Sequence, residues 1–507
     1  MKNTIAFKTG RGNNYLYSPK MNRLMLAHPI LAYLINLSGK GVDLKKWLAS
    51  VKNNGLVLND YGKVSKKKLL FYYQKYLLLQ ENGYFTAVDI KKKISGKLSA
   101  KDIEFQLANS YNVVFEVTDA CNLGCEYCGY GKFYSDYDKR ENKNLTAAAA
   151  KNLLNYLQTL WASPLNRSLN HKVNIGFYGG EPLLNLNFIK EIVDFAKNMP
   201  APPHRFTFSM TTNGLLLLRD PGFLVENNFQ VSVSLDGDEK NNAYRVYPSG
   251  KPAFKDILKS VNAFRERYPD FFKQNVNFIA VLHNKNSAAD IHKFFKENFD
   301  KTPRISEVNL NGIVPERKEE FLKTYRNLYE SLDQAEDYAV IEKDLYYLTP
   351  GYQVISEFLR QYSGYVFKDY RQLIQGKKDI VYTPTATCLP FSRKVFLTVN
   401  GKILPCERIG HKYGLGFAGE NKVDLDFQKI ADTYNSYYEK LRKQCGSCAT
   451  VGNCQQCMFL LDMECPDPEC RGHMDAGFFT KYISAAVSYL EKKPASYTKI
   501  MKEIIVE

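Results

Sequence analysis

The sequence predicts an α/β fold with a parallel sheet in the middle of the chain. Six runs rich in β-branched and aromatic residues recur there, at residues 113–118, 173–178, 206–210, 231–235, 276–282 and 307–313. Stretches with helical periodicity lie between them, at 145–160, 188–196 and 254–265. Such alternation is typical of parallel sheets with right-handed crossovers.

Polar motifs follow five of these strands at the point where each strand ends. They are Cys121, Gly179-Gly180-Glu181, Thr211-Thr212-Asn213-Gly214, Asp236-Gly237 and His283-Asn284. In a parallel barrel, ligand sites are built from the loops at the carboxyl ends of the strands. The sequence therefore predicts one functional site at this edge of the sheet.

Cys121, Cys125 and Cys128 follow the first strand with the spacing C-x3-C-x2-C. Chance would produce this spacing only roughly 0.005 times in a chain of this cysteine content. A [4Fe–4S] cubane held by three thiolates keeps one iron open, and that iron can chelate a small molecule. Zinc usually takes four closed ligands. The three cysteines are also too close together for an independent disulfide framework.

An aromatic residue precedes the third cysteine in the C-E-Y-C motif at 125–128, and the G-G-E-P motif at 179–182 follows about fifty residues later. Together these motifs resemble those of the radical S-adenosylmethionine (radical SAM) enzymes, over about residues 106–490. The resemblance implies a partial (β/α)6 TIM-like barrel. It also implies that the open iron binds S-adenosylmethionine, whose reductive cleavage gives a 5′-deoxyadenosyl radical that abstracts hydrogen from the substrate.

The glycine motif is expected to contact this cofactor. Gly179 and Gly180 would let the backbone approach the methionyl group and offer carbonyl acceptors to its ammonium. Glu181 would pair with a cationic group or fix the loop. The alternative is an ordinary glycine turn between a strand and a helix.

Other cofactor contacts follow from the resemblance. Arg245 is expected to bind the methionyl carboxylate through its planar fork, with a solvated surface arginine as the alternative. The adenine is expected to lie against Tyr127 and against Val281 or Leu282, although apolar residues at a strand end are otherwise simply core. The remaining expected contacts are Ser209, Thr211 and Asn213 for the ribose, and Ser234 near the carboxylate.

The other eight cysteines lie in the last quarter of the chain: Cys388, Cys406, Cys445, Cys448, Cys454, Cys457, Cys465 and Cys470. Asn400-Gly401, between apolar runs at 395–399 and 402–404, predicts a type I′ hairpin with Cys406 at the end of its second strand. The pattern resembles a SPASM domain, which carries two auxiliary [4Fe–4S] clusters. Eight thiolates equal the ligands of two such clusters. A pair of zinc knuckles is the alternative.

The sequence departs from the SPASM pattern in two places. The spacing from Cys454 to Cys457 is one residue shorter than usual, and only Cys388 precedes the hairpin. The resemblance assigns Cys445, Cys448, Cys454 and Cys470 to an outer cluster, and Cys388, Cys406 and Cys457 to an inner one. Cys465 either completes the inner cluster or leaves it an open iron for substrate sulfur.

The first 105 residues have a pattern of their own. Runs at 4–8 and 14–18 flank a G-R-G turn and predict a hairpin. A third strand is expected at 23–27, then helices from Pro29 and at 72–80, and a short strand starting at 83–85. This order resembles small winged-helix domains that capture leader peptides by adding a strand to a sheet edge. A structural cap for the barrel is the alternative.

Composition bounds the partners. Hydrophobic content of 45% and charged content of 24% are ordinary globular values. No signal peptide is visible, and the longest apolar run, at 24–37, is too short for a membrane span. A cytoplasmic location with reduced cysteines is therefore expected. The net charge of +16 could attract nucleic acid or acidic peptides or simply reflect surface lysines, and no motif points to nucleic acid.

These resemblances together imply a radical SAM/SPASM peptide maturase. The expected divisions are a leader-binding domain (1–105), the radical SAM core (106–345), a bridging region (346–385), the SPASM domain (386–490) and a tail (491–507). Its partners would be a ribosomally made precursor peptide, crosslinked through a thioether or carbon–carbon bond, and an electron donor such as flavodoxin or ferredoxin. Neither a membrane nor nucleic acid is expected as a partner.

Two alternatives remain open. An anaerobic sulfatase-maturing enzyme would oxidise Cys or Ser to formylglycine, and such enzymes carry Asp where this chain has Glu407. An iron–sulfur scaffold or regulator would have no catalytic role. In the maturase, Glu407 is expected to act as a general base for a substrate radical as it is oxidised. A surface glutamate paired with Arg408 is the alternative.

Overall fold

A computed structural model describes residues 4–59, 61–87, 90–168, 171–203, 205–310, 312–336, 341, 344–345, 350–362, 381 and 383–503. Most of the expected bridging region 346–385 lies outside the described residues. No helix among those described is long and apolar enough to cross a membrane.

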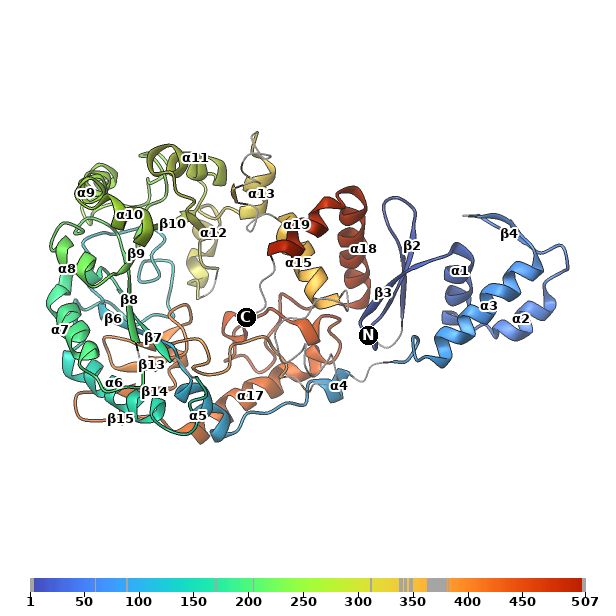
Figure 1. Cartoon of the computed structure of the whole chain (residues 1–507), viewed down its shortest axis with the longest axis horizontal. Coiled ribbons are helices and arrows are strands. Elements are labelled where there is room, and N and C mark those ends of the chain that lie inside the picture. The colour runs from blue at the N-terminus through green and yellow to red at the C-terminus, as the bar shows by residue number, and fades with distance from the viewer. Residues whose placement is uncertain are drawn as a thin grey trace.

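The core of the chain is a sheet whose first six strands run parallel in chain order, as predicted (Figure 1). These strands are β6 (Asn112–Thr118), β7 (Lys172–Gly179), β8 (Arg205–Thr212), β9 (Gln230–Ser234), β10 (Val276–Leu282) and β11 (Arg304–Glu307). The predicted sixth strand is wrong, because β11 ends where that strand was expected to start. Beyond β11 the chain leaves the sheet: buried Val308 packs beside Phe133 and Phe321, and Ile313 bridges to Tyr134.

Helices cover the outer face of these strands (Figure 1). They are α6 (Ala147–Trp161), α7 (Leu186–Lys197), α8 (Pro221–Glu226), α9 (Phe254–Arg267), α10 (Pro269–Asn275) and α11 (Ala288–Phe299). Alternate side chains of β8 are buried, whereas those between them are only half-buried. This alternation separates a helix-facing side from an interior side.

The C-terminal hairpin extends the same sheet. β12 (Val395–Leu397) pairs parallel with β6, and β13 (Lys402–Leu404), β14 (Gly416–Ala418) and β15 (Val423–Asp424) follow in antiparallel order. The predicted hairpin is confirmed but its turn type is wrong: Gly401 has φ +79° whereas Asn400 has no positive φ. Type I′ needs positive φ at both positions, so the loop is a longer one with a single left-handed glycine.

The N-terminal strands form their own antiparallel sheet, with β1 (Ile5–Lys8), β2 (Asn14–Ser18) and β3 (Arg23–Ala27) at or near the expected positions. The elements that follow are α1 (Pro29–Gly39), α2 (Leu44–Ser50), β4 (Leu56–Leu58), β5 (Gly62–Val64) and α3 (Lys66–Glu81). The strand expected at 83–85 is absent. Those residues form a turn, and the hydroxyl of Tyr84 donates to the carbonyls of Leu16 and Arg23.

The N-terminal sheet packs against C-terminal helices. Tyr17 contacts the rings of Tyr362 and Phe479, which lie on α15 (Pro350–Tyr362) and α18 (Ala476–Lys492). Figure 1 shows α1, α2 and α3 at the end of the molecule far from the parallel strands. The expected boundary at 105 falls inside α5 (Ala100–Ala108), which packs on α17 (Phe427–Cys445).

Candidate active site

Cys121, Cys125 and Cys128 lie in the loop after β6 and are half-buried. The Cys121 sulfur accepts from the backbone N–H of Leu123 at 3.4 Å. The Cys128 sulfur accepts from Nη2 of Arg140 at 3.2 Å. Each of these sulfurs therefore receives a donor, as is usual for thiolates that bind iron.

The three thiols could each bind a different iron of a cubane. Among the described residues, no group of three or more His, Cys, Asp or Glu side chains is arranged to hold a single metal ion. Burial raises the pKa of Cys125 to about 12, so its ionised form requires a cation beside it. The Nε of Arg140 is buried without a partner among the described residues, which leaves a donor free beside these thiols.

Gly179 and Gly180 pack directly on the chain that leads to Cys121. A Cβ added at Gly179, where φ is +134°, would lie 2.3 Å from the carbonyl oxygen of Thr118. A Cβ at Gly180 would lie 2.0 Å from that of Ala120. The backbone N–H of Gly180 donates to Thr118 at 2.7 Å. Close packing therefore requires both glycines, whether or not their carbonyls also contact a cofactor.

Glu181 is fully buried and fixes this loop, the second of its two expected roles. It accepts from the hydroxyl of Thr212 at 2.7 Å and from the N–H groups of Asn213 at 2.8 Å and Leu183 at 3.1 Å. Burial raises its pKa to about 7 although these bonds oppose the shift. No cation bonded to it is found among the described residues. Glu181 thus ties the loop after β7 to the loop after β8.

The predicted ribose contacts lie on or beside the interior side of the sheet. Ser209 and Thr211 are on the half-buried side of β8, and Ser234 holds the same position on β9. Nδ2 of Asn213 donates to Oδ1 of Asn122 at 2.7 Å and reaches the Cys121 sulfur at 3.8 Å. Asn213 thus supports the cysteine loop, and the ribose contacts stay a prediction.

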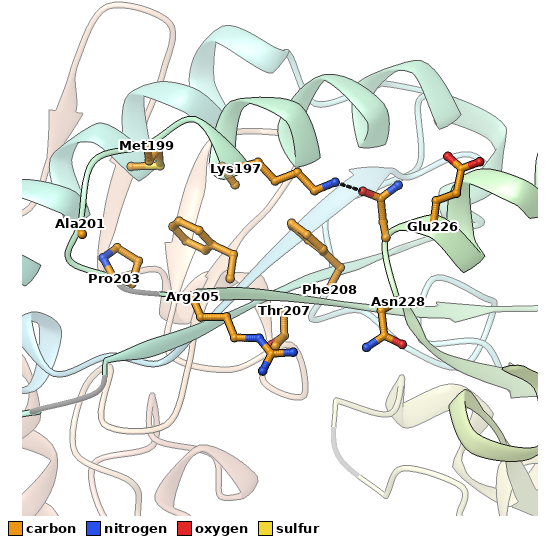
Figure 2. A pocket seen from close by; sticks show the side chains of 12 residues that line it. Lys197, Met199, Ala201, Pro203, Arg205, Thr207, Phe208, Glu226 and Asn228 are labelled. Atoms are coloured by element: carbon orange, nitrogen blue, oxygen red, sulfur yellow. Dashed lines mark hydrogen bonds between the residues drawn. The ribbon is translucent and has the colours of Figure 1, made fainter.

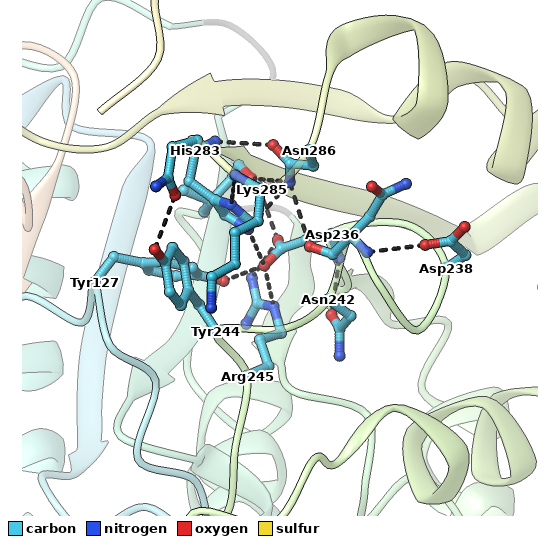
Figure 3. A network of polar contacts seen from close by, with 12 residues as sticks. Tyr127, Asp236, Asp238, Asn242, Tyr244, Arg245, His283, Lys285 and Asn286 are labelled. Carbon is cyan, nitrogen blue, oxygen red and sulfur yellow. Dashed lines mark hydrogen bonds and ion pairs between the residues drawn. The ribbon is translucent and has the colours of Figure 1, made fainter. Parts of the chain in front are cut away.

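Arg245 lies in a buried network centred on Asp236 (Figure 3). Its Nε and Nη2 donate to the two oxygens of Asp236 at 3.1 and 3.0 Å. The N–H of Val281 donates to the same carboxylate at 2.8 Å. The solvated-surface alternative for Arg245 is wrong, because the residue is only 6% exposed and its fork binds Asp236. Its contact with the methionyl carboxylate stays a prediction.

The same network fixes Tyr127. Its hydroxyl donates to Asp236, and its ring stacks on His283 with centroids 5.9 Å apart. Burial lowers the pKa of His283 to about 4, so this imidazole is neutral. Tyr127 is thus held rigidly beside Cys128, while its contact with adenine stays a prediction.

Leu282 does not face the interior. Phe278, on the same side of β10, contacts Phe295 and Phe299 of α11 with centroids 4.6 and 4.7 Å apart. Leu282 is fully buried on that helix-facing side, whereas Val281 is half-buried on the opposite side. Leu282 is therefore a core residue, and its predicted contact with adenine is wrong. The contact of Val281 with adenine stays a prediction.

The eight C-terminal cysteines differ in burial: Cys445 and Cys448 are buried, whereas Cys388 is exposed. Burial and the thiols of Cys454, Cys448 and Cys470 raise the pKa of Cys445 to about 12. Burial and the thiols of Cys457, Cys388 and Cys406 similarly raise the pKa of Tyr434. These are the two sets that the resemblance assigned to the outer and inner clusters. The thiol of Cys465 donates instead to the carbonyl of Asp467 at 3.6 Å. Ligation by any of these cysteines stays a prediction.

Glu407 is an inner residue with an unexpected partner. Nζ of Lys394 lies 2.7 Å from its carboxylate, whose side chain is only 18% exposed, so the surface pairing with Arg408 is wrong. Burial acts to raise the pKa of Glu407, but the charge and hydrogen bond of Lys394 outweigh it and hold that pKa below its usual value. Glu407 is therefore ionised at neutral pH.

Several interior residues escaped the sequence argument. Glu116 of β6 is fully buried and accepts from the Tyr130 hydroxyl and, at 2.9 Å, from the N–H of Val399. Burial raises its pKa to about 7. Burial raises the pKa of both Tyr137 and Tyr178. The ring centroid of Tyr137 lies 5.1 Å from that of His411, and that of Tyr178 lies 6.4 Å from that of Phe396 on β12. An acidic residue inside an apolar strand was the one signal available in the sequence.

A cavity of about 370 Å³ lies elsewhere, at the amino end of β8 (Figure 2). It is lined by residues of β8, of the end of α7 and of the turn after α8, among them Lys197, Arg205 and Asn228. Nζ of Lys197 is bonded to Asn227. The cysteine loop lies at the carboxyl end of the strands, so this cavity is not part of the candidate active site.

Comparison with known proteins identifies the family. Residues 115–297 match the radical SAM superfamily. The chain is 25% identical to the radical SAM cyclopropyl synthase TigE of Paramaledivibacter caminithermalis over 67% of this chain and 65% of that protein. It is 30% identical to the cysteine-type anaerobic sulfatase-maturating enzyme of Clostridium novyi over 35% of this chain and 44% of that enzyme. It thus spans less than two thirds of either relative.

A solved structure of anSMEcpe with bound AdoMet is 17% identical, with a TM-score of 0.49 over 78% of this chain and 96% of that one. The chain belongs to the radical SAM superfamily, whose members use a [4Fe–4S] cluster and S-adenosylmethionine.

Proposed function

We propose that this protein is a radical SAM peptide maturase that installs a crosslink in a ribosomally made precursor peptide. The observation that carries the proposal is that Tyr137 and Tyr178 contact the C-terminal region: the ring centroid of Tyr137 lies 5.1 Å from that of His411, and that of Tyr178 lies 6.4 Å from that of Phe396 on β12. A substrate held beside these tyrosines would meet the radical source on one side and Glu407 on the other. The pairing of β12 with β6 supports this arrangement, because it joins the two cysteine regions through one sheet.

The chemistry divides between cofactor and chain. When bound, the cluster and S-adenosylmethionine supply the radical that removes hydrogen from the substrate. Forming a thioether or carbon–carbon bond from the substrate radical then releases one proton and one electron. Glu407 accepts the proton, since Lys394 keeps it ionised. The electron needs an iron–sulfur oxidant, for which Cys388, Cys406 and Cys457 are the proposed ligands. A flavodoxin or ferredoxin would supply the electron that starts the cycle.

The N-terminal sheet supports a peptide substrate. Among the described residues β3 pairs only with β2, and a strand at the edge of a sheet can accept a peptide strand. Large apolar side chains are exposed on β3 and on α3, among them Leu26 (63% exposed) and Phe71 (56% exposed). Residues 40–80 hold nine lysines against two aspartates and no other charged residue, a net charge of +7. Residues 1–105 would therefore bind an acidic leader with apolar anchors.

The proposal also assigns the domains of the chain. The radical SAM core would occupy residues 106–345, the SPASM domain 386–490, with a bridging region at 346–385 and a tail at 491–507. Because the N-terminal sheet packs on α18, deleting residues 1–105 would uncover a buried face. Substitutions at Leu26 and Phe71 therefore test leader binding better than truncation does.

The direct experiment is an anaerobic reaction of the reconstituted protein with S-adenosylmethionine, dithionite and a peptide encoded by a short neighbouring reading frame. We expect 5′-deoxyadenosine together with a peptide that has lost two hydrogens for each crosslink, measured by mass spectrometry. Cofactor cleavage with an unmodified peptide would contradict the maturase. Absence of cleavage by the loaded protein would favour the scaffold.

The alternative function, sulfatase maturation, is suggested by the similarity to the enzyme from Clostridium novyi. Glu407 argues against it, because the resemblance places Asp at this position in such enzymes. A sulfatase peptide offered in the same reaction separates the two functions, since formylglycine formation would be detected as a new aldehyde.

A further inference from the structure

Arg140 lies on the segment between the cysteine loop and α6 and contacts a cluster ligand directly. Its Nη2 donates to the Cys128 sulfur at 3.2 Å. Its guanidinium carbon lies 4.7 Å from the centroid of the Tyr130 ring. Its Nε is buried and has no partner among the described residues. A permanent positive charge and a free donor therefore stand beside the iron site.

Tyr130 links this arginine to the C-terminal hairpin. The Tyr130 hydroxyl donates to one oxygen of Glu116, and the other oxygen accepts from the N–H of Val399 at 2.9 Å. Val399 lies in the loop between β12 and β13. The ring beneath Arg140 is thus held by a carboxylate that is itself fixed by the hairpin.

Asp138 fastens the same segment to the hairpin a second time. Its carboxylate accepts from Nζ of Lys402 at 2.7 Å and from Nδ2 of Asn400 at 3.0 Å. Its backbone N–H donates to Nδ1 of His411 at 3.2 Å. Two independent sets of contacts therefore fix where Arg140 stands relative to Cys128.

We propose that Arg140 is a positioning residue that makes the cluster on Cys121, Cys125 and Cys128 easier to reduce, and that Tyr130 holds it in place. Reduction adds one negative charge to the cluster. A cation that donates to a ligand sulfur stabilises that charge, most strongly where water is excluded. This inference depends on the cluster and not on the peptide proposed as substrate, so the two can fail separately.

The test is a redox titration of the full-length reconstituted protein, followed by electron paramagnetic resonance without any peptide. The signal that changes on adding S-adenosylmethionine belongs to the cluster with the open iron. In Arg140→Gln we expect the ratio of reduced to oxidised cluster at a fixed potential to fall about tenfold, a midpoint about 59 mV more negative. Arg140→Lys keeps the charge but loses the planar fork, so a smaller shift in the same direction is expected.

Arg265→Gln is the matched control. Arg265 of α9 also makes one hydrogen bond, at 2.6 Å to the carbonyl of Asn298, and also lies over an aromatic ring, at 5.2 Å from that of Phe299. Its midpoint should stay that of the unmodified protein. Equal midpoints in Arg140→Gln and the unmodified protein, with equal iron content, would overturn the proposal.

Tyr130→Phe is a second test, to be used if the Arg140→Gln protein does not bind a cluster. This variant keeps every cysteine and the arginine but loses the bond to Glu116. The expected shift is again negative and smaller than that of Arg140→Gln. Unchanged midpoints in both Tyr130→Phe and Arg140→Lys would overturn the proposal without any need for the glutamine variant.

Discussion

Cys121, Cys125 and Cys128 lie in one loop after one strand, whereas the C-terminal cysteines extend from Cys388 to Cys470 over a hairpin, a helix end and irregular chain. The first loop receives its support from neighbouring strand ends, through Asn213 and Glu181. The second region is assembled by tertiary packing around residues such as Tyr434. The difference teaches that the first region should work as a local unit, while the second depends on the whole fold.

Replacing cysteines in each region in turn should separate them most strongly. With all three proposed cubanes bound, the protein would hold about twelve irons. Exchanging Cys121, Cys125 and Cys128 for Ala should abolish cleavage of S-adenosylmethionine and leave about eight irons, measured by iron assay and chromatography of 5′-deoxyadenosine. Cleavage at the original rate in this variant would defeat the assignment of the first region.

The reciprocal variant exchanges Cys445, Cys448, Cys454 and Cys470 for Ala. It should lose about four irons while cleavage persists, provided that circular dichroism shows an intact fold. Loss of all cleavage by this folded variant would break the comparison, because the first region would then depend on the second.

Glu407→Gln asks whether the second region acts in the chemistry after cleavage. The glutamine keeps the shape but cannot accept the proton, so product should form roughly 10²-fold more slowly or worse while 5′-deoxyadenosine still forms. Glu420→Gln, on the exposed loop after β14, is the control and should change neither rate. An unchanged rate of peptide modification would show that Glu407 has only a structural role, as the partner of Lys394.

The proposed leader-binding site in residues 1–105 is a third region, which can be compared with the two cysteine regions. Leu26→Asp or Phe71→Asp should weaken binding of the precursor peptide about tenfold, because each removes an exposed apolar anchor. Leu218→Asp changes a similarly exposed residue of the barrel and should leave binding unchanged. Calorimetric titration measures the affinity, and cleavage without peptide should be equal in all three variants. Equal affinities would favour the structural cap.

The sequence predicted the local features and missed those that depend on tertiary contacts. Strand positions and the Cys121 loop follow from periodicity and spacing, so five of the six barrel strands appear close to where they were expected. The orientation of Leu282 and the fork of Arg245 depend on which neighbour lies opposite, and no local pattern encodes that. Lys394 was missed as the partner of Glu407 because it lies thirteen residues away across a hairpin.

Glu116 joins the two cysteine regions through its bonds with Tyr130 and Val399. Its protonation makes the stability of this link depend on pH. Burial raises its pKa from 4.5 to about 7, so the folded state binds its proton more tightly than the unfolded state does. The resulting stabilisation is present below about pH 4.5 and is lost as pH rises towards 7, on the order of 3 kcal/mol.

Glu116→Gln resembles the protonated form: its amide can donate towards Tyr130 while its oxygen accepts from Val399. The variant should therefore remove much of the loss of stability between about pH 5 and about pH 8, measured by urea unfolding. Glu181→Gln is the informative contrast, because both oxygens of Glu181 accept from backbone N–H groups that cannot reverse. That variant should be destabilised by about 1–3 kcal/mol at either pH. A steeper dependence in Glu116→Gln would contradict this account.

Asp138 should show the smallest effect, with the opposite sign. Burial acts to raise its pKa, but the bonds from Lys402 and Asn400 and the charge of Lys402 hold that pKa below its usual value. Its stabilisation is therefore present above the ordinary pKa of an aspartate and is lost as pH falls through the lowered value. The side chain of Asp138 is 25% exposed, so solvent screens part of the interaction. Asp138→Asn should therefore lower the free energy of unfolding by only about 1 kcal/mol at neutral pH and by almost nothing in acid.

Two links between the same two cysteine regions would thus respond oppositely to pH. As pH rises, the link through Glu116 weakens and the link through Asp138 strengthens. Urea unfolding of the Glu116→Gln, Asp138→Asn and double variants across pH would resolve the two contributions, and a cost of Asp138→Asn that grows in acid would refute the second.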